Sequence, residues 1–217
     1  MTHCFSMLFP GQGSQSLGML SELSASFPQV ASTFQEASDI FGEDLWALSQ
    51  TGPADKLNQT IYTQPALLAA DVAVWRCWQA SNGPTPAYMA GHSLGEYAAL
   101  VCSGVLSFPD AISLVADRGR FMQKAVAPGV GAMAAVIGLD DSAVIALCHE
   151  ALSVGIVSPA NFNSVGQVVV AGERAAVDQV IFLDTCQRLA VQCIAESVND
   201  SSLACTITRA TVVTALV

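Results

Sequence analysis

The chain has little charge, and little positive charge in particular. Only 12% of its 217 residues are charged, and 8 Lys and Arg stand against 18 Asp and Glu, so the formal net charge is −10. Nucleic-acid binding requires clustered Lys and Arg that neutralise phosphates, so we expect no nucleic-acid partner. The hydrophobic content of 52% excludes a disordered chain and predicts a compact body.

Long apolar runs and cysteine pairs are also missing. No stretch approaches the roughly 20 apolar residues that span a bilayer, and residues 1–10 carry neither a basic start nor a cleavage motif. We therefore expect a cytoplasmic protein with no membrane insertion. The 7 cysteines never form a Cys-x-x-Cys pair, which predicts reduced, mostly buried thiols and no metal site.

Residues 88–100 hold the most informative pattern in the chain. An apolar run ends in Gly-x-Ser-x-Gly and passes into an alanine-rich segment, which predicts a strand, a tight turn and a helix with Ser93 at the tip. Gly91 and Gly95 would stand where backbone meets backbone and a Cβ would clash. The N–H of Leu94, unpaired in the first helical turn, is placed to hold a developing oxyanion. This turn is typical of a serine nucleophile.

A second glycine-containing loop follows the first predicted strand at residues 4–9. Residues 10–16 read Pro-Gly-Gln-Gly-Ser-Gln-Ser, which lacks the third glycine of a dinucleotide fingerprint and the Gly-Lys-Ser/Thr of a phosphate loop. Two interpretations stay open. The loop is a plain strand-to-helix turn, or it lies over the turn at Ser93 and the backbone N–H of Gln12 is the second oxyanion donor.

Helical patterns cover residues 24–41, 63–78 and 107–127. The second is expected to begin at Thr63-Gln64-Pro65, with the proline in the first turn and Gln64 either lining a site or merely capping the helix. In the third, Arg120 has Asp117 three residues earlier, which predicts a surface ion pair. Arg118 has no acid at its helical neighbour positions, so it must find a partner elsewhere, bind an anionic ligand or extend into water.

A new pattern begins after the predicted hinge at residues 128–131. Strands are expected at 132–139, 155–162 and 167–171, helices at 140–151 and 173–183, and a last strand at 189–195. This order predicts a small ferredoxin-like α+β subdomain. We therefore expect three parts: the N-terminal part of a large subdomain at 1–127, the small subdomain at 128–195 and a divergent tail at 196–217.

Taken together, these motifs resemble the bacterial malonyl-CoA:acyl carrier protein transacylase family, of the FabD type. The resemblance covers residues 1–180. It implies an α/β fold in which a parallel sheet is flanked by helices, an acyltransferase core of the α/β-hydrolase kind that is incomplete here. The segments that carry the resemblance are residues 9–15, 63–67, 90–97, 118–123, 131–135 and 161–169.

The resemblance also implies a function in fatty acid biosynthesis, a ping-pong acyl transfer through a malonyl-serine intermediate. Ser93 would take malonyl from malonyl-CoA, the Gln12 and Leu94 N–H groups would hold the oxyanion, and Arg118 would pair with the malonyl carboxylate. The phosphopantetheine thiol of acyl carrier protein would then collect the group. No cofactor is expected beyond malonyl-CoA as substrate. Arg120 and Lys124, the remaining members of the only cationic cluster, are predicted to dock the acidic carrier protein.

The sequence departs from the family after Val180. The family continues with a Ser-x-x-x-His-type stretch whose histidine is the base for the serine, whereas residues 181–217 contain no histidine, glycine or proline. His3, His92 and His149 are poor substitutes, and a serine without a base is a weak nucleophile. We hypothesise that the tail is an out-of-frame or otherwise altered ending of a transacylase reading frame.

Two further functions compete with an active transacylase. A truncated, catalytically impaired fragment would at most bind CoA or acyl carrier protein, and on mechanism the missing base favours it. A serine esterase would share the turn at Ser93. An esterase function leaves Arg118 unexplained. Transfer of the acyl group to the carrier protein rather than to water distinguishes a transacylase from an esterase.

Overall fold

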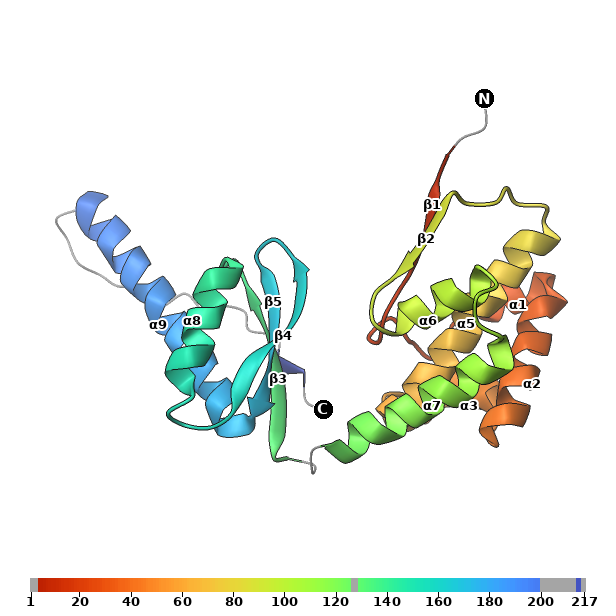
Figure 1. Ribbon diagram of the computed structural model, residues 1–217, viewed down its shortest axis with the longest axis horizontal. Coiled ribbons are helices and arrows are strands. Elements are labelled where there is room, and N and C mark those ends of the chain that lie inside the picture. The colour runs from red at the N-terminus through yellow and green to blue at the C-terminus, as the bar shows by residue number, and fades with distance from the viewer. Residues whose placement is uncertain (1–3, 126–128, 200–213, 216–217) are drawn as a thin grey trace. The chain divides into compact units, whose positions relative to one another are not determined.

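The computed structural model describes residues 4–125, 129–199 and 214–215, and the chain divides into two units, Met1–Ala125 and Val126–Val217. Each unit has its own hydrophobic core, so each is described by itself. Helices and strands are present in both, which confirms the α/β class (Figure 1). The boundary predicted after residue 127 falls in residues 126–128, outside the described residues. Over the described ranges, no helix combines the length and apolarity needed to cross a bilayer.

The first unit contains a parallel pair of strands, β1 (Ser6–Phe9) and β2 (Tyr88–Gly91), which lie side by side in Figure 1. Their register runs from Ser6 beside Tyr88 to Phe9 beside Gly91. Side chains alternate between the two faces of a strand, so Phe9 enters the core while Leu8 and Tyr88, 75% and 71% exposed, lie on the other face. Helix α6 (Leu94–Cys102) packs against both strands.

The helices before β2 differ from the expected ones at their starts. The helix predicted over 24–41 is confirmed as α2 (Pro28–Phe41), but its start is wrong. Residues 24–26 belong to a separate helix, α1 (Ser21–Ser26), because Phe27 is extended and Pro28 begins a new helix at its first position. Two short helices follow, α3 (Leu45–Thr51), whose N-cap Asp44 accepts a hydrogen bond from the Ala47 N–H, and α4 (Ala54–Leu57).

Helix α5 (Thr60–Ala80) is the centre of this unit and contacts α2, α6 and α7 (Phe108–Ala125). It begins earlier than predicted, so Pro65 lies inside the helix rather than in its first turn. A proline here removes only one helical hydrogen bond near the helix start. Burial of Thr60, Thr63 and Gln64 ahead of it keeps that segment helical.

Helices α5 and α7 lie close together at Gly119. A Cβ added there would lie 2.9 Å from the Cα of Ile61 and 2.9 Å from the carbonyl oxygen of Thr60. Both atoms belong to the backbone of α5 and cannot rotate away. The missing side chain at Gly119 therefore sets the spacing between the start of α5 and the second half of α7.

The second unit runs β3 (Gly131–Ile137), α8 (Asp141–Ala151), β4 (Val157–Ser164), β5 (Gln167–Glu173), α9 (Arg174–Asn199) and β6 (Thr214–Ala215). The strands are antiparallel in the order β4-β5-β3-β6, and α8 and α9 pack on the sheet. Asp140 caps α8 by accepting from the Ala143 N–H at 2.7 Å, and this bond lowers the pKa of its carboxyl.

The strand predicted at 189–195 is wrong, because α9 continues through these residues to Asn199. No glycine or proline follows residue 180, so nothing in the sequence stops the helix where the prediction ended it. The strand that pairs with β3 on that side is β6, through Met133 beside Ala215. Of the predicted tail at 196–217, residues 200–213 and 216–217 lie outside the described residues.

One buried acid in the first unit has an unusual environment. Asp71 lies on α5, and its Oδ2 atom is buried without a hydrogen-bond partner in the part of the chain that the structure describes. Burial raises the pKa of Asp71 to about 7. Burial, and next the charge of Asp71, raise the pKa of the Cys102 thiol on α6 to about 12, so this thiol is inert at neutral pH.

Replacing Gly119 with alanine tests the close approach of α5 and α7. The added methyl group must displace backbone, so we expect Gly119→Ala to lose about 1–3 kcal/mol of unfolding free energy despite the higher helix propensity of alanine. Urea unfolding followed by circular dichroism measures this. Ser113→Ala, at an exposed position of the same helix, is the control. A Gly119→Ala protein as stable as wild type would contradict the packing argument.

The Asp71 environment predicts a pH-dependent stability. The folded-state pKa lies above the unfolded value, so the folded state holds the proton more tightly, and this contribution is full below pH ~4 and lost as pH rises through about 7. Asp71→Asn should remove the dependence and raise the unfolding free energy at pH 8 by as much as ~4 kcal/mol relative to wild type. Denaturant unfolding at pH 5 and pH 8 checks it, with Asp55→Asn on exposed α4 as control. Parallel pH profiles for wild type and Asp71→Asn would refute it.

Candidate active site

Ser93 sits at the turn between β2 and α6, as the sequence predicts. Its backbone is at φ 54 and ψ −100, a conformation that non-glycine residues rarely adopt. The turn is held by the His92 N–H, which donates to the Phe9 carbonyl at 3.2 Å, and by the Gly95 N–H, which donates to the His92 carbonyl at 2.9 Å. The strand, turn and helix predicted at residues 88–100 are confirmed.

The two glycines of this motif stand where three backbone segments meet. A Cβ on Gly91 would lie 1.9 Å from the carbonyl carbon of Gly95, and a Cβ on Gly95 would lie 2.2 Å from the carbonyl oxygen of Phe9. The predicted backbone crowding is confirmed. The positive φ that such a turn requires falls on Ser93 itself rather than on the glycines.

The two predicted oxyanion donors belong to segments that adjoin this turn. Leu94 is the first residue of α6, where a backbone N–H has no acceptor within the helix and the helix dipole is positive. Gln12 lies in the loop after β1, and its Nε2 donates to Thr60 Oγ1 at 3.1 Å. The same loop touches the turn at Gly11, where an added Cβ would lie 2.8 Å from the His92 carbonyl oxygen.

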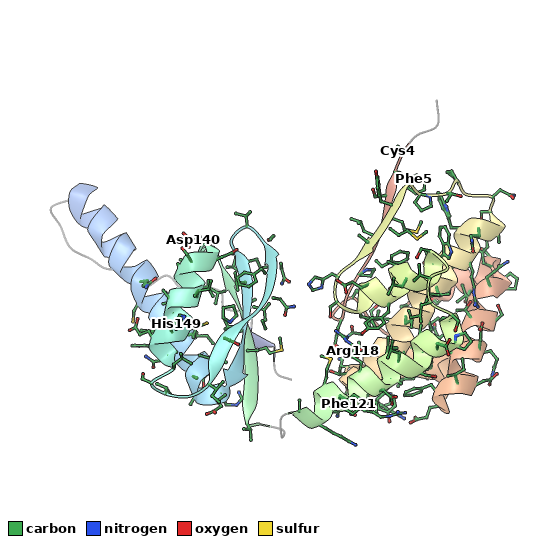
Figure 2. The ribbon with its side chains drawn as sticks, in the orientation of Figure 1. Cys4, Phe5, Arg118, Phe121, Asp140 and His149 are labelled. Atoms are coloured by element: carbon green, nitrogen blue, oxygen red, sulfur yellow. The ribbon has the colours of Figure 1, made fainter. Side chains whose placement is uncertain are left out.

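Arg118 reaches Ser93 from α7. Its Nη2 donates to Ser93 Oγ at 2.8 Å and its Nη1 donates to Gln64 Oε1 at 2.8 Å. The guanidinium carbon also lies 5.6 Å from the centre of the Tyr97 ring. Arg118 is labelled in Figure 2, on α7, which ends at Ala125. No carboxylate among residues 4–125 forms an ion pair with this guanidinium, so the described groups that hold it are neutral.

This geometry fits what the comparisons with known proteins find. The model of the acyl transferase domain family matches residues 6–211. The chain belongs to this family. The malonyl CoA-acyl carrier protein transacylase of Salmonella typhimurium is 59% identical over 175 residues, covering 81% of this chain and 57% of the relative. The resemblance drawn from the motifs is confirmed, and the chain spans about half the length of the curated relatives it matches.

Solved structures agree with this assignment. The malonyl CoA-acyl carrier protein transacylase of Coxiella burnetii has a TM-score of 0.83 and 52% identity, covering 85% of this chain and 58% of that one. A malonyl-transacylase solved in complex with a type II PKS acyl-carrier protein has a TM-score of 0.82 and 56% identity, covering 85% and 60%. The fold of this acyl transferase domain is therefore shared with proteins of that name.

Gln64 is the site residue that the sequence described least well. The sequence leaves open whether Gln64 lines a site or caps a helix start. In the structure it is completely buried inside α5 and bonded to Arg118. The signal was weak because a single glutamine in an apolar helix has no periodic pattern of its own. Only the packing of α5 against α7 brings residues 64 and 118 together.

The other cations of α7 in this acyl transferase domain face solvent. Arg120 pairs with Asp117, which confirms the predicted surface pair. Lys124 is exposed near the helix end. Phe121 lies between them in sequence and is 72% exposed (Figure 2). This end of α7 offers cationic and apolar groups on its surface.

The two described histidines, His92 and His149, belong to different units of the chain. His92 is exposed and adjoins Ser93 in the chain, and His149 lies on α8 in the second unit (Figure 2). His3 lies outside the described residues. Within the ranges that the structure describes, no group of three or more His, Cys, Asp or Glu residues is placed to hold a metal ion.

Proposed function

We propose that this chain carries out malonyl transfer: Ser93 accepts the malonyl group of malonyl-CoA and passes it to the phosphopantetheine thiol of an acyl carrier protein. The observation that carries the proposal is the 2.8 Å hydrogen bond from Arg118 Nη2 to Ser93 Oγ, which joins a cation to a nucleophile. Relatives and solved neighbours named as malonyl transacylases support the proposal, as does the one solved with a carrier protein.

The first half-reaction forms one ester and releases one thiol. Ser93 Oγ attacks the thioester carbon, the carbonyl oxygen becomes an oxyanion, and the carbon–sulfur bond breaks as CoA leaves with the proton lost by the serine. The backbone N–H groups of Leu94 and Gln12 are the proposed oxyanion donors, since each is offered by a segment that meets at the turn. In the second half-reaction the carrier thiol attacks the carbonyl carbon of the malonyl ester. The bond to Ser93 Oγ breaks, and the serine takes up the proton that the thiol loses.

Arg118 is the proposed selector of the acyl group. Its guanidinium contacts a hydroxyl, an amide oxygen and an aromatic ring, and these leave its charge uncompensated in the described part of the chain. The carboxylate of malonyl supplies the missing anion in a two-pronged pair. An acetyl group offers no such partner, so a half-buried arginine would remain unpaired beside it.

The finer architecture is part of the proposal. The first unit, with its parallel strand pair and the turn at Ser93, corresponds to the beginning of an α/β-hydrolase-like core in which helices flank a parallel sheet. The second unit, with the order β-α-β-β-α-β, corresponds to a ferredoxin-like subdomain. A cytoplasmic location and independence of any cofactor stay predictions.

A second candidate function rests on the missing base. Residues 181–217 contain no histidine, so no family histidine activates Ser93 from that segment. The alternative is a fragment that binds malonyl-CoA or the carrier protein and turns over slowly. Such a protein would show saturable binding with acylation slower by orders of magnitude than a complete transacylase.

Acylation of Ser93 tests the two functions directly. After incubation with malonyl-CoA, intact-mass spectrometry should show one added malonyl group, which Ser93→Ala should abolish because the nucleophilic oxygen is gone. Ser103→Ala, at the exposed end of α6, is the matched control and should acylate like wild type. Binding of malonyl-CoA without any adduct at long times would favour the impaired fragment, and an adduct that persists in Ser93→Ala would refute the proposed nucleophile.

Carrier docking through the cations of α7 gives a separate prediction. Arg120→Glu should weaken binding of acyl carrier protein about 3–10-fold at low salt, because it places negative charge where an acidic partner approaches. Isothermal titration with holo-carrier measures this without requiring turnover. Lys56→Glu makes the same charge change at another cation that also pairs with an acid, Glu43, and should leave binding unchanged. Equal weakening by both variants would contradict a docking site on α7, because the change in net charge alone would then explain it.

A further inference from the structure

Gln64 is a fully buried polar residue whose two amide atoms both contact α7. Its Oε1 accepts from Arg118 Nη1 at 2.8 Å, and its Nε2 donates to the sulfur of Met122 at 3.1 Å. An arginine can only donate and a thioether can only accept, so these two partners fix which way the amide points. Arg118 and Met122 are four residues apart and therefore share one face of α7.

The close contact between α5 and α7 makes this arrangement rigid. Gly119 lies against the backbone of Thr60 and Ile61, so the helix that carries Arg118 cannot shift toward or away from Gln64 without opening the packed interface. The guanidinium is then held between Gln64 on one side and Ser93 on the other. One terminal nitrogen is anchored to the scaffold, and the other meets the nucleophile.

The chemistry of the anchor matters as much as its position. Glutamine and glutamate have the same shape, but glutamate at this position would form an ion pair with Arg118 and neutralise it before any substrate arrives. Glutamine accepts the hydrogen bond and leaves the positive charge in place. A neutral anchor is thus what an arginine needs if it is to recognise a carboxylate in its ligand.

We propose that Gln64 is a positioning residue that sets acyl selectivity, by orienting the Arg118 guanidinium toward Ser93 while leaving its charge free for the carboxylate of the acyl group. The inference rests on the proposed function and goes beyond it by naming the group that controls the discrimination. A purely structural role for Gln64 predicts something different: substitutions would lower stability and slow every acyl substrate to the same extent.

The test compares acylation of Ser93 by malonyl-CoA and by acetyl-CoA in wild type and two variants. In Gln64→Glu the built-in carboxylate should lower the malonyl rate at least 10-fold and leave the acetyl rate within about 2-fold, because only malonyl competes for the guanidinium. In Gln64→Met, which keeps the volume but loses the acceptor, the malonyl rate should fall about 10-fold. Gln79→Glu, at an exposed position of α5, is the charge control and should keep the wild-type ratio.

An unchanged malonyl-to-acetyl ratio in Gln64→Glu would overturn the inference and leave the proposed function intact. If the Gln64 variants do not fold, Met122→Leu decides: Met122 is 47% exposed and the exchange conserves volume, so it should fold and lower the ratio about 3-fold through the lost contact to the amide. A wild-type ratio in Met122→Leu would then overturn the inference.

Binding of malonate alone separates this inference from the proposed function. Calorimetric titration should show that wild type binds malonate and that Gln64→Glu binds it at least 10-fold more weakly. In the variant, the carboxylate introduced at position 64 already pairs with the Arg118 guanidinium. If wild-type Ser93 takes no acyl group but malonate binding still depends on Gln64, the proposed function fails and the positioning role stands. Equal malonate binding by wild type and Gln64→Glu would overturn the positioning role, whatever the acylation result.

Discussion

Backbone crowding around Ser93 is the constraint on which the rest of the site depends. The end of β1, the end of β2 and the first turn of α6 meet so closely that side chains on Gly91 or Gly95 would overlap neighbouring carbonyl groups. This contact forces the chain to reverse within two residues and places the strain on Ser93, whose φ is positive. Ser93, the start of a helix and the adjoining loop are thereby brought to one point.

Helix α5 supplies the second half of the arrangement. Its first two turns bond the Gln12 side chain through Thr60, hold Arg118 through Gln64 and accept the close approach of α7 at Gly119. Two distant parts of the chain, the loop after β1 and helix α7, therefore contact one helix, which is buried along most of its length. The same burial encloses Asp71 farther along α5 and raises its pKa to about 7, so the helix that organises the site also carries a cost in stability at neutral and higher pH.

The electrostatics of the site favour an anionic acyl group. In a chain with a formal net charge of −10, a guanidinium held by described groups that are all neutral is an unusual feature. An uncompensated guanidinium bonded to Ser93 Oγ is what the proposed selection of a carboxylate-bearing thioester requires, and an esterase would have no use for it. Residues 181–217 contain no histidine, and a serine without a neighbouring base is a weak nucleophile.

Local patterns determined much of this protein. The turn at residues 91–95, the strand at β1, the pairing of Arg120 with Asp117 and the alternation of helices and strands in the second unit all follow from residues close in sequence, whose spacing is set by backbone geometry. Helix limits were less predictable. The strand expected at 189–195 was wrong because helix propensity continued without a stop signal, and Pro65 did not mark a helix start because buried neighbours outweighed one lost hydrogen bond.

Contacts between distant residues were decided only by tertiary structure. The sequence indicated that Arg118 had no acid within its own helix, but it did not name Gln64 and Ser93 as its partners, since these lie on two other elements. The burial of Gln64 and Asp71 likewise came from the packing of α5 against its neighbours. The physical reason is that periodicity records which face of a helix is apolar, whereas the angle and spacing at which two helices meet depend on every side chain in the interface.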